Sequence, residues 1–328
     1  MPEPNNRPSR SSICMVVCYF GKLPPYVGCV FRSCASNPDI NWLIFTDDIT
    51  PRKLPPNVRL EPATLAGLQK EFSQKLGFEV NLSHSRLLCH FKAAYGFLFE
   101  EFLTKFDFWG HCDLDMVFGD LRKFLREDIL TAYPKILCRG HFCLYRNTVE
   151  VNRYFMLLTP GAPTYRAAFQ SGSTEAYGFD EWRGVYLILR HHNIPQFHDE
   201  FIADIVQPTR WKYTRFEGVA IPNHPEQVFY WHQGRVFHAY YNADRGINDD
   251  EYAYIHFQKR PLPAPAFDPF AVSGFLVTPD GFFPYNREPL SDEDFARYNR
   301  GRWRPKEQLV RRLRLVIGKR LGLVPWES

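Results

Sequence analysis

The sequence predicts an α/β fold, and three features near its beginning carry that prediction. Residues 13–20, ICMVVCYF, form an unbroken apolar run that ends at Gly21 and is typical of a buried, parallel strand. Residues 26–35 fit a short helix, and residues 41–46, NWLIFT, form a second apolar strand. A strand, a helix and a strand in this order favour a sheet built with crossover connections.

The alternation of helices and strands continues to about residue 192. Ser83 or Ser85 can cap the strongest of the later helices, in which apolar side chains recur at helical spacing. The predicted helices after the second strand are residues 64–75, 83–102, 119–129, 149–158 and 180–192. The predicted strands are residues 58–60, 106–112, 135–138 and 141–145.

The pattern changes at residue 227. The run VFYWHQGRVFHAYY predicts a β-hairpin that turns at Gln233-Gly234, and residues 252–257 are a further strand candidate. Residues 261–290 are rich in proline and aromatic residues and contain a turn at residues 279–281. Helices are predicted at residues 291–299 and 306–321.

The composition indicates a folded protein of a reducing compartment. The chain has 328 residues, enough for one large α/β domain, with 45% hydrophobic and 23% charged residues. Its eight cysteines lie mostly in apolar runs and form no CxxC pair, which favours free thiols over a zinc site. No secretory signal is evident, and no run approaches the roughly 18 apolar residues of a transmembrane helix. We therefore expect a cytoplasmic protein.

An acidic pair, Asp113 and Asp115, follows the strand predicted at residues 106–112. Side chains at alternate positions of an extended chain project to the same side, so the two carboxylates point together. Ligands of open α/β sheets bind at the carboxyl ends of strands, and paired carboxylates there suit Mg²⁺ or Mn²⁺. Such a cation binds phosphate oxygens and makes a diphosphate a good leaving group. The alternative is a pair of exposed loop acids without a metal.

The segment FDFWGHCDLDMVFGDL and the upstream SRLLCHFKAAYGFLF resemble the bacterial glycosyltransferase-like proteins linked to capsular and cell-surface polysaccharide synthesis. These are GT-A type proteins with a DxD motif. The resemblance extends over about residues 13–260 and includes NWLIFTDD, GFDEWRG and IHFQKR. It implies a GT-A-like nucleotide-diphospho-sugar transferase fold, that is, a Rossmann-like mixed sheet flanked by helices. It also implies a divalent metal, Mn²⁺ or Mg²⁺, and a nucleotide-sugar donor, expected to be UDP-linked.

The resemblance also implies where the donor lies. By this analogy Tyr19 and Gly21 line the donor site, and Asp47 meets the base or the ribose. A carboxylate at a strand end, from Asp47 or its neighbour Asp48, can accept hydrogen bonds from ribose hydroxyls or a base N–H. An Asx turn or a helix cap explains either residue equally well.

Basic residues and one histidine are further candidates for binding. Lys92 interrupts an apolar helix face and is preferred over Arg86 for contact with a phosphate or the donor sugar, although a solvated surface role is the default for either. The resemblance implies that His256 completes the metal site with Asp113 and Asp115, and imidazole suits Mn²⁺ better than Mg²⁺. An ordinary core or surface histidine is the alternative. Lys259 follows it closely and could clamp the diphosphate.

Asp180 and Glu181, in GFDEWRG, are the candidates for the general base. An inverting transfer needs a carboxylate that deprotonates the acceptor hydroxyl as it attacks the anomeric carbon. Acids at a helix start are also favourable for the helix dipole alone, so both explanations stay open. We prefer Asp180 for the base, without choosing between inverting and retaining chemistry.

The expected activity is therefore that of a hexosyltransferase-type glycosyltransferase acting on a cell-surface polysaccharide or a lipid-linked glycan. A nucleotidyltransferase acting on sugar phosphates is one alternative, but it would usually need a glycine-rich, basic loop after the first strand, and GKLPPY supplies little of that. A carbohydrate-binding protein that keeps the fold without the chemistry is the other.

We expect a disordered lead-in at residues 1–12, a catalytic domain at residues 13–260 and a C-terminal extension at residues 261–328. Residues 302–320 carry eight basic side chains and one acid, so the remainder of this chain of net charge +4 sums to −3. The helix at residues 306–321 has an apolar side and a basic side, which fits either a peripheral contact with the inner face of the plasma membrane or docking on the domain. Nucleic-acid binding is not expected, because the body is acidic and lacks a binding motif.

Overall fold

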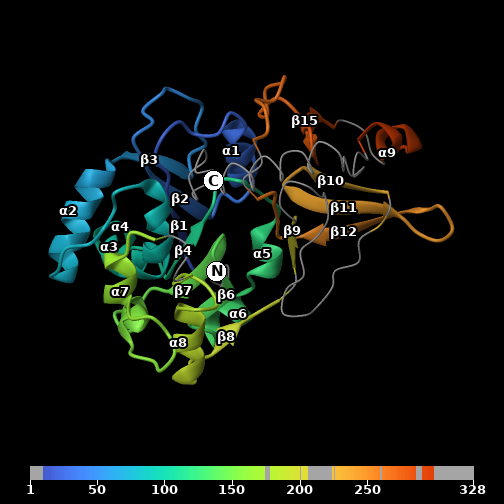
Figure 1. Cartoon of the computed structure of the whole chain (residues 1–328). Helices are drawn as coiled ribbons and strands as arrows, with labels where there is room; N and C mark the ends of the chain where they lie inside the picture. The colour runs from blue at the N-terminus through green and yellow to red at the C-terminus, as the bar shows by residue number, and fades with distance from the viewer. Residues whose placement is uncertain are drawn as a thin grey trace, which may run out of the picture.

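The computed structural model describes residues 10–173, 178–199, 201–205, 224, 226–258, 261–285 and 290–298. Within these residues the strands form a seven-stranded, a five-stranded and a three-stranded sheet. Helices pack on the seven-stranded sheet, so the predicted α/β class, a mixed sheet flanked by helices, is confirmed (Figure 1). The predicted helix at residues 306–321 lies outside the described residues.

The seven-stranded sheet has the order β3-β2-β1-β4-β7-β6-β8. Its strands are β1 (Ile13–Cys18), β2 (Ile40–Thr46), β3 (Val58–Pro62), β4 (Phe108–Cys112), β6 (Lys135–Arg139), β7 (Phe142–Arg146) and β8 (Gln196–Phe197). The first four run parallel to one another, and β7 is antiparallel to both β4 and β6. The order reverses between β1 and β4, and the crevice beside such a reversal is the usual ligand site of an open α/β sheet.

The alternating side chains of β1 enter two separate cores. Ile13, Met15 and Val17 face a core that contains α1 (Val27–Ala35) and most of the two smaller sheets. Cys14 and Val16 face the other core. That core contains α2 (Leu65–Leu76), the 3₁₀ helix η1 (Ser85–Ala94), α3 (Tyr95–Leu98), α4 (Glu100–Leu103), α7 (Tyr165–Gln170) and α8 (Val185–His191). Figure 1 shows α2, α3, α4 and α7 together on the left of the sheet.

Local sequence signals explain where α2 begins and ends. The Thr64 hydroxyl accepts a hydrogen bond from the backbone N–H of Gly67, as an N-cap does. Gly77 follows the helix with a φ of 73°, a left-handed conformation that glycine adopts without strain. The helix predicted at residues 64–75 is therefore confirmed almost residue for residue.

The segment 83–102 differs from the prediction of one long helix. It folds as η1, α3 and α4 in succession, although its apolar side chains are buried as the spacing predicts. Gly96, which has low helix propensity, lies in α3 against the indole of Trp109. The predicted helix 119–129 likewise divides into α5 (Leu121–Phe124) and α6 (Glu127–Ala132), and the predicted helix 149–158 is the shorter 3₁₀ helix η2 (Val151–Met156). Tertiary packing has overridden helical periodicity in these segments.

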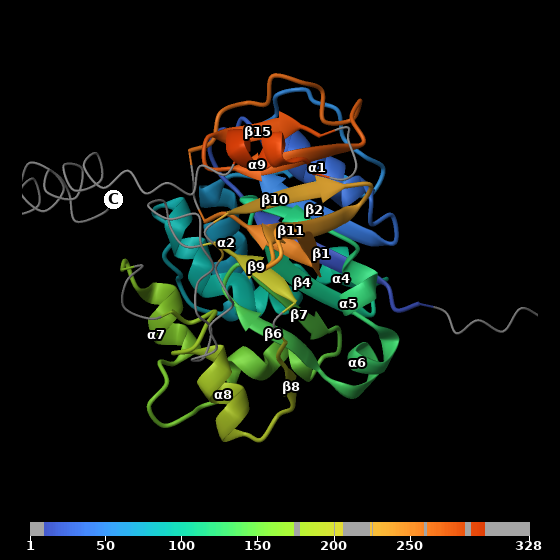
Figure 2. The ribbon, with the colours of Figure 1, turned by 90° about the vertical axis from the view of Figure 1, so that its right-hand side faces the viewer.

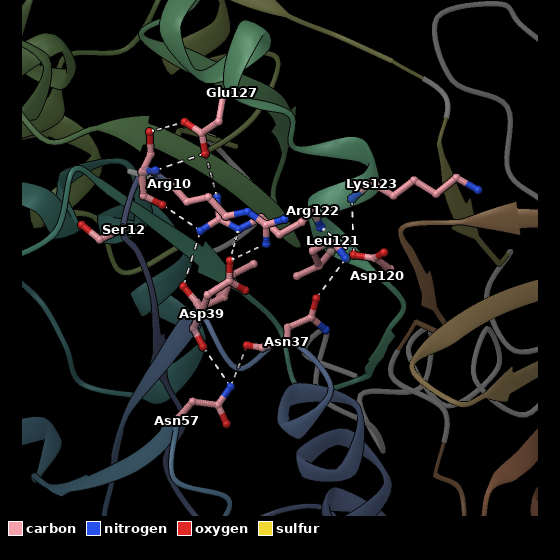
Figure 3. Close-up of polar contacts among 12 residues, drawn as sticks. Arg10, Ser12, Asn37, Asp39, Asn57, Asp120, Leu121, Arg122, Lys123 and Glu127 are labelled. Atoms are coloured by element: carbon pink, nitrogen blue, oxygen red, sulfur yellow. Dashed lines mark hydrogen bonds and ion pairs between the residues drawn. The ribbon is translucent and has the colours of Figure 1, made fainter. Parts of the chain in front are cut away.

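A polar network fixes the chain that follows the acidic pair (Figure 3). The Asn37 side chain donates to the carbonyl of Gly119 at 2.8 Å and accepts from the N–H of Leu121 at 2.9 Å. The guanidinium of Arg122 donates to Asp39 at 2.8 Å and to the carbonyl of Ser11 at 2.7 Å. These bonds tie the start of α5 to the connection between α1 and β2.

The five-stranded antiparallel sheet has the order β12-β11-β10-β14-β15. Its β10 (Gln227–His232) and β11 (Arg235–Tyr241) form the predicted hairpin, and Gln233 and Gly234 have φ angles of 47° and 85° in its turn. The sequence did not predict β12 (Ile247–Tyr252), β14 (Gly274–Thr278) or β15 (Gly281–Pro284). This sheet uses strands from both sides of residue 260, and the division of the chain into domains stays a prediction.

The three-stranded sheet brings distant segments to the end of β4. It consists of β5 (Met116–Phe118), β13 (Tyr254–His256) and β9 (Ile202–Asp204), with β13 in the centre. Figure 2 shows β9 between the seven-stranded and five-stranded sheets. Because β5 directly follows the acidic pair, its pairing with β13 places residue 256 beside that pair.

Two further predictions can be compared with the described residues. Each of the eight cysteines is described and free, as expected. Among the described helices, none has both the length and the apolar character needed to cross a membrane.

Candidate functional site

The acidic pair lies in the short connection between β4 and β5. Asp113 follows Cys112 directly, and its N–H donates to the carbonyl of His141 at 3.0 Å. The carbonyl of Asp115 accepts from the N–H of Phe257 at 3.0 Å. The loop is thus held from one side by the residue before β7 and from the other by the residue after β13. Asp115 is buried, whereas the Asp113 side chain is 31% exposed.

The structure brings His256 to this pair. Its Nε2 atom lies 3.6 Å from Oδ1 of Asp115. One potential ligand atom from each of Asp113, Asp115 and His256 lies within 4.8 Å of the others. Ligands of one octahedral cation with bonds of about 2.1 Å lie about 3 to 4 Å apart, so this donor set fits Mn²⁺ or Mg²⁺ after small side-chain adjustments.

The other ring nitrogen of His256 is also engaged. Nδ1 lies 2.8 Å from Oδ1 of Asp204 on β9, a residue that the sequence analysis did not single out. Burial alone would lower the pKa of His256, but the Asp115 and Asp204 carboxylates outweigh it and raise the pKa to about 9. Burial raises the pKa of Asp204, because it disfavours the charged carboxylate. The hydrogen bond with His256 and the nearby His141 have the larger, opposite effect and bring that pKa below the usual range. His141, Asp204 and His256 form a second group with metal-ligand spacing, and all three are buried.

Lys92, on η1, makes an ion pair with the acidic pair. Its Nζ lies 2.7 Å from Oδ1 of Asp113 and donates to the carbonyl of Gly140 at 2.6 Å. Burial lowers the pKa of Lys92, but the carboxylates of Asp113 and Asp180 more than offset this and hold the pKa above its ordinary value. Arg86, on the same 3₁₀ helix, is exposed. The side chain of Lys92 therefore faces the candidate site.

Asp180 and Glu181 lie near Lys92 and Gly140. Glu181 accepts a hydrogen bond from the N–H of Gly140 at 3.2 Å, and Gly140 also binds Lys92. Asp180 is 5% exposed, and burial raises its pKa to about 7 although Lys92 opposes the shift. Both acids lie in turns, because α8 begins only at Val185. Their predicted position at a helix start is therefore wrong, and a charge–dipole role does not explain them.

The predicted donor residues lie at the carboxyl ends of β1 and β2. The N–H of Gly21, with a φ of 91°, donates to Oδ1 of Asp47 at 2.7 Å. Asp47 thus has a local structural role, and its side chain is otherwise exposed. Tyr19 is half-buried, and burial together with the charge of Asp115 raises its pKa, which places it near the acidic pair. Lys259 lies outside the described residues.

The comparisons with known proteins give a family. The family of unknown function DUF6625 matches residues 15–286, most of the chain, so the protein belongs to that family. No curated protein matches the sequence.

One solved structure with some similarity is the apo form of mouse xyloside xylosyltransferase 1. The TM-score is 0.35 at 11% sequence identity, over 60% of this chain and 88% of that one. The α/β fold is evident from the sheet topology itself.

Proposed function

We propose that this member of the DUF6625 family is a metal-dependent glycosyltransferase, which moves a sugar from a nucleotide diphosphate donor to a hydroxyl group of a glycan. The observation that carries the proposal is the convergence of Asp113, Asp115 and His256 at the carboxyl end of β4. These residues lie beside the reversal of strand order between β1 and β4, where α/β sheets bind nucleotides.

The proposed metal is Mn²⁺ or Mg²⁺, held by the two carboxylates and the imidazole. When bound, such a cation neutralises negative charge that develops on the leaving diphosphate. The nitrogen ligand favours Mn²⁺. Asp113 is the most exposed of the three, so its side of the site is open to a donor phosphate.

The proposed donor is a UDP-sugar that lies along the ends of β1 and β2. Gly21 and Asp47 are linked there by a hydrogen bond, and Tyr19 is close enough to Asp115 for the charge of that carboxylate to raise its pKa. The exposed Asp47 carboxylate has the chemistry to accept a hydrogen bond from the ribose or the base. This arrangement supports a GT-A-like mode of donor binding.

Asp180 is the proposed general base. A carboxylate with a pKa of about 7 can accept a proton near neutral pH, whereas an ordinary aspartate is a weaker base. It would take the proton of the acceptor hydroxyl while that oxygen attacks the anomeric carbon. The bond to the nucleotide diphosphate breaks, and the diphosphate leaves with the electron pair. Glu181 is less suited, because its carboxylate already accepts from Gly140.

The proposed acceptor is a cell-surface polysaccharide or a lipid-linked glycan. This part of the proposal depends on the resemblance of residues 13–260 to bacterial proteins of capsule synthesis. A peripheral membrane contact through residues 306–321 would suit a lipid-linked acceptor.

Release of nucleotide from sugar donors tests the activity. The full chain is incubated with a panel of nucleotide sugars, with and without Mn²⁺, and free nucleoside diphosphate is measured. We expect Mn²⁺-dependent release from at least one donor, together with a thermal shift by UDP plus Mn²⁺.

Two other outcomes would support the alternatives. Pyrophosphate release from a nucleoside triphosphate and a sugar phosphate, without donor hydrolysis, would identify a nucleotidyltransferase. Binding of glycans with neither reaction would identify a carbohydrate-binding protein, and the proposed function would then be wrong.

A further inference from the structure

Asp204 is a buried carboxylate that faces the side of His256 turned away from the acidic pair. We propose that Asp204 is a positioning residue: it holds His256 so that Nε2 points at the cation, and it increases metal affinity without binding the metal itself. The inference rests on the proposed metal site at Asp113, Asp115 and His256, and it goes further by assigning a role to a residue outside that site.

The three-stranded sheet sets the relative position of these residues. The central strand β13 pairs with β9 and β5 at once, so His256 lies opposite Asp204 on one side and Met116 on the other. The N–H of Ile205 donates to the carbonyl of His256 at 2.9 Å. The backbone therefore fixes Asp204, His256 and the end of the acidic loop in one register.

Two contacts then determine the orientation of the imidazole. The hydrogen bond of 2.8 Å between Nδ1 and Asp204 fixes the rotation of the ring within its plane. The ring of His141 stacks on it with centroids 3.9 Å apart and planes at 22°, which fixes the plane itself. In this orientation Nε2 points towards Asp115, and its distance to Oδ1 of that residue is 3.6 Å. Such preorganisation lowers the cost of forming a metal bond.

The partners of Asp204 argue that it orients rather than ligates. Its Oδ1 accepts from Nδ1 of His256 and also from Nε2 of Gln258 at 2.8 Å. Its Oδ2 lies 3.8 Å from a guanidinium nitrogen of Arg139. A metal that bound Nδ1 of His256 together with His141 and Asp204 would replace the hydrogen bond between Nδ1 and Asp204. A metal held by Asp113, Asp115 and His256 keeps that hydrogen bond and uses Nε2.

This arrangement matches a general pattern of metalloproteins. A histidine ligand commonly donates its second N–H to a carboxylate, which fixes the tautomer and makes the ligating nitrogen more basic. Loss of such a partner typically weakens metal binding about 10- to 100-fold. The structure therefore predicts a defect in metal affinity, not only in activity, when Asp204 is changed.

The first test measures Mn²⁺ affinity of the full chain by electron paramagnetic resonance of free Mn²⁺. The variants are Asp204→Asn, His256→Ala and the double substitution, with the exposed Asp244→Asn as the matched control. We expect Asp204→Asn to raise the Kd about 10-fold or more and Asp244→Asn to leave it unchanged. The double variant should bind no more weakly than His256→Ala alone, because Asp204 acts through His256.

The outcomes separate this inference from the proposed function. Absence of Mn²⁺ binding by the unaltered protein would remove the metal site itself. Binding by the unaltered protein with an unchanged Kd in Asp204→Asn would overturn the positioning role alone. If Asp204→Asn weakens binding equally with and without His256, Asp204 is a ligand in its own right and the inference is also wrong.

A second measurement needs no substitution and decides the matter if Asp204→Asn does not fold. Nitrogen NMR of the full chain, labelled in histidine and loaded with diamagnetic Cd²⁺, reports which ring nitrogen binds the metal. We expect Nε2 of His256 to be metal-bound and Nδ1 to keep its proton. A metal bond at Nδ1, with the proton on Nε2, would overturn the inference.

Discussion

The Nζ atom of Lys92 lies 2.7 Å from Oδ1 of Asp113 and so joins the 3₁₀ helix η1 to the loop that follows β4. The same ammonium group donates to the carbonyl of Gly140, whose N–H binds Glu181. One lysine therefore connects the proposed metal ligand with the turn that carries the proposed base. It also neutralises part of the negative charge that the acidic residues bring together.

Replacing Lys92 with methionine should separate these two roles. The free energy of unfolding without metal should fall by roughly 1 to 3 kcal/mol, because the Asp113 carboxylate and the Gly140 carbonyl lose a shared partner in a largely buried place. The increase in melting temperature on adding Mn²⁺ should exceed that of the unaltered protein, because the cation no longer competes with an ammonium group. Denaturant titration and thermal melts measure both.

Arg86→Met is the matched control, since Arg86 lies on the same 3₁₀ helix and is exposed. Its stability should change by less than about 0.5 kcal/mol. An equal loss in both variants would mean that the ion pair with Asp113 contributes nothing specific.

Replacing Asp115 with alanine should abolish the response to metal. Loss of a group that only hydrogen-bonds a metal ligand costs about 10- to 100-fold in affinity, so removal of a direct ligand should raise the Kd for Mn²⁺ more than about 100-fold. The thermal shift by UDP plus Mn²⁺ and the release of nucleotide should both disappear. Asp244→Ala, at an exposed position, should keep both signals. A normal thermal shift in Asp115→Ala would place the metal elsewhere.

Asp180→Asn should stabilise the protein in a pH-dependent way. The folded-state pKa of Asp180 is about 7, above the ordinary value of 3.8, because burial disfavours its charge. Below about pH 3 the carboxyl is protonated in both the folded and unfolded chains and costs nothing. Between about pH 3 and 7 the unfolded chain releases the proton first, so the folded state loses stability as pH rises. Above pH 7 the cost is complete.

The free energy of unfolding of Asp180→Asn should therefore equal that of the unaltered protein near pH 3 and exceed it by roughly 2 to 4 kcal/mol at pH 8. Urea titrations across this range measure the difference. Asp244→Asn should show no such trend. If the difference is the same at every pH, the carboxyl of Asp180 titrates normally and is a poor candidate for the base.

Gly96→Ala should destabilise the core beneath the site. A Cβ atom at this position would lie 2.1 Å from Nε1 of Trp109, a residue of β4 whose ring stacks on Tyr145 with centroids 4.4 Å apart. The indole has no room to move, so we expect a loss of about 1 to 3 kcal/mol in the free energy of unfolding. Gly28→Ala is the control. Gly28 lies within helix α1, and a Cβ atom there would make an ordinary contact of 3.5 Å with Pro269. That variant should be neutral or slightly stabilised.

Most strands could be predicted from the sequence, whereas several helices could not. A buried strand such as β1 or β2 can be recognised in the sequence as a continuous apolar run, because both of its faces pack in cores. The β10–β11 hairpin was equally clear from Gln233-Gly234. In contrast, β12 has the polar sequence INDDEY, and the pattern of its side chains does not indicate a strand. Its place at the edge of the five-stranded sheet comes from pairing with β11.

The candidate site divides in the same way. The DxD pair after an apolar strand was visible in the sequence, and the resemblance pointed to His256. Asp204 carried no local signal, because it is one acid in a short strand some 50 residues before its partner. Its relation to His256 exists only because β9 and β13 pair in one register.

The sequence by itself determined the α/β class, the hairpin and a strand that ends in two carboxylates, since these depend on the order of apolar and polar residues along the chain. Only the tertiary structure decided the other charge pairs: Lys92 with Asp113, and His256 with Asp204. The physical reason is that pairing of sheets and burial of side chains act between residues far apart in the chain. They bring charged groups to within a few ångströms, where burial and mutual attraction set the pKa values and the fit for a metal.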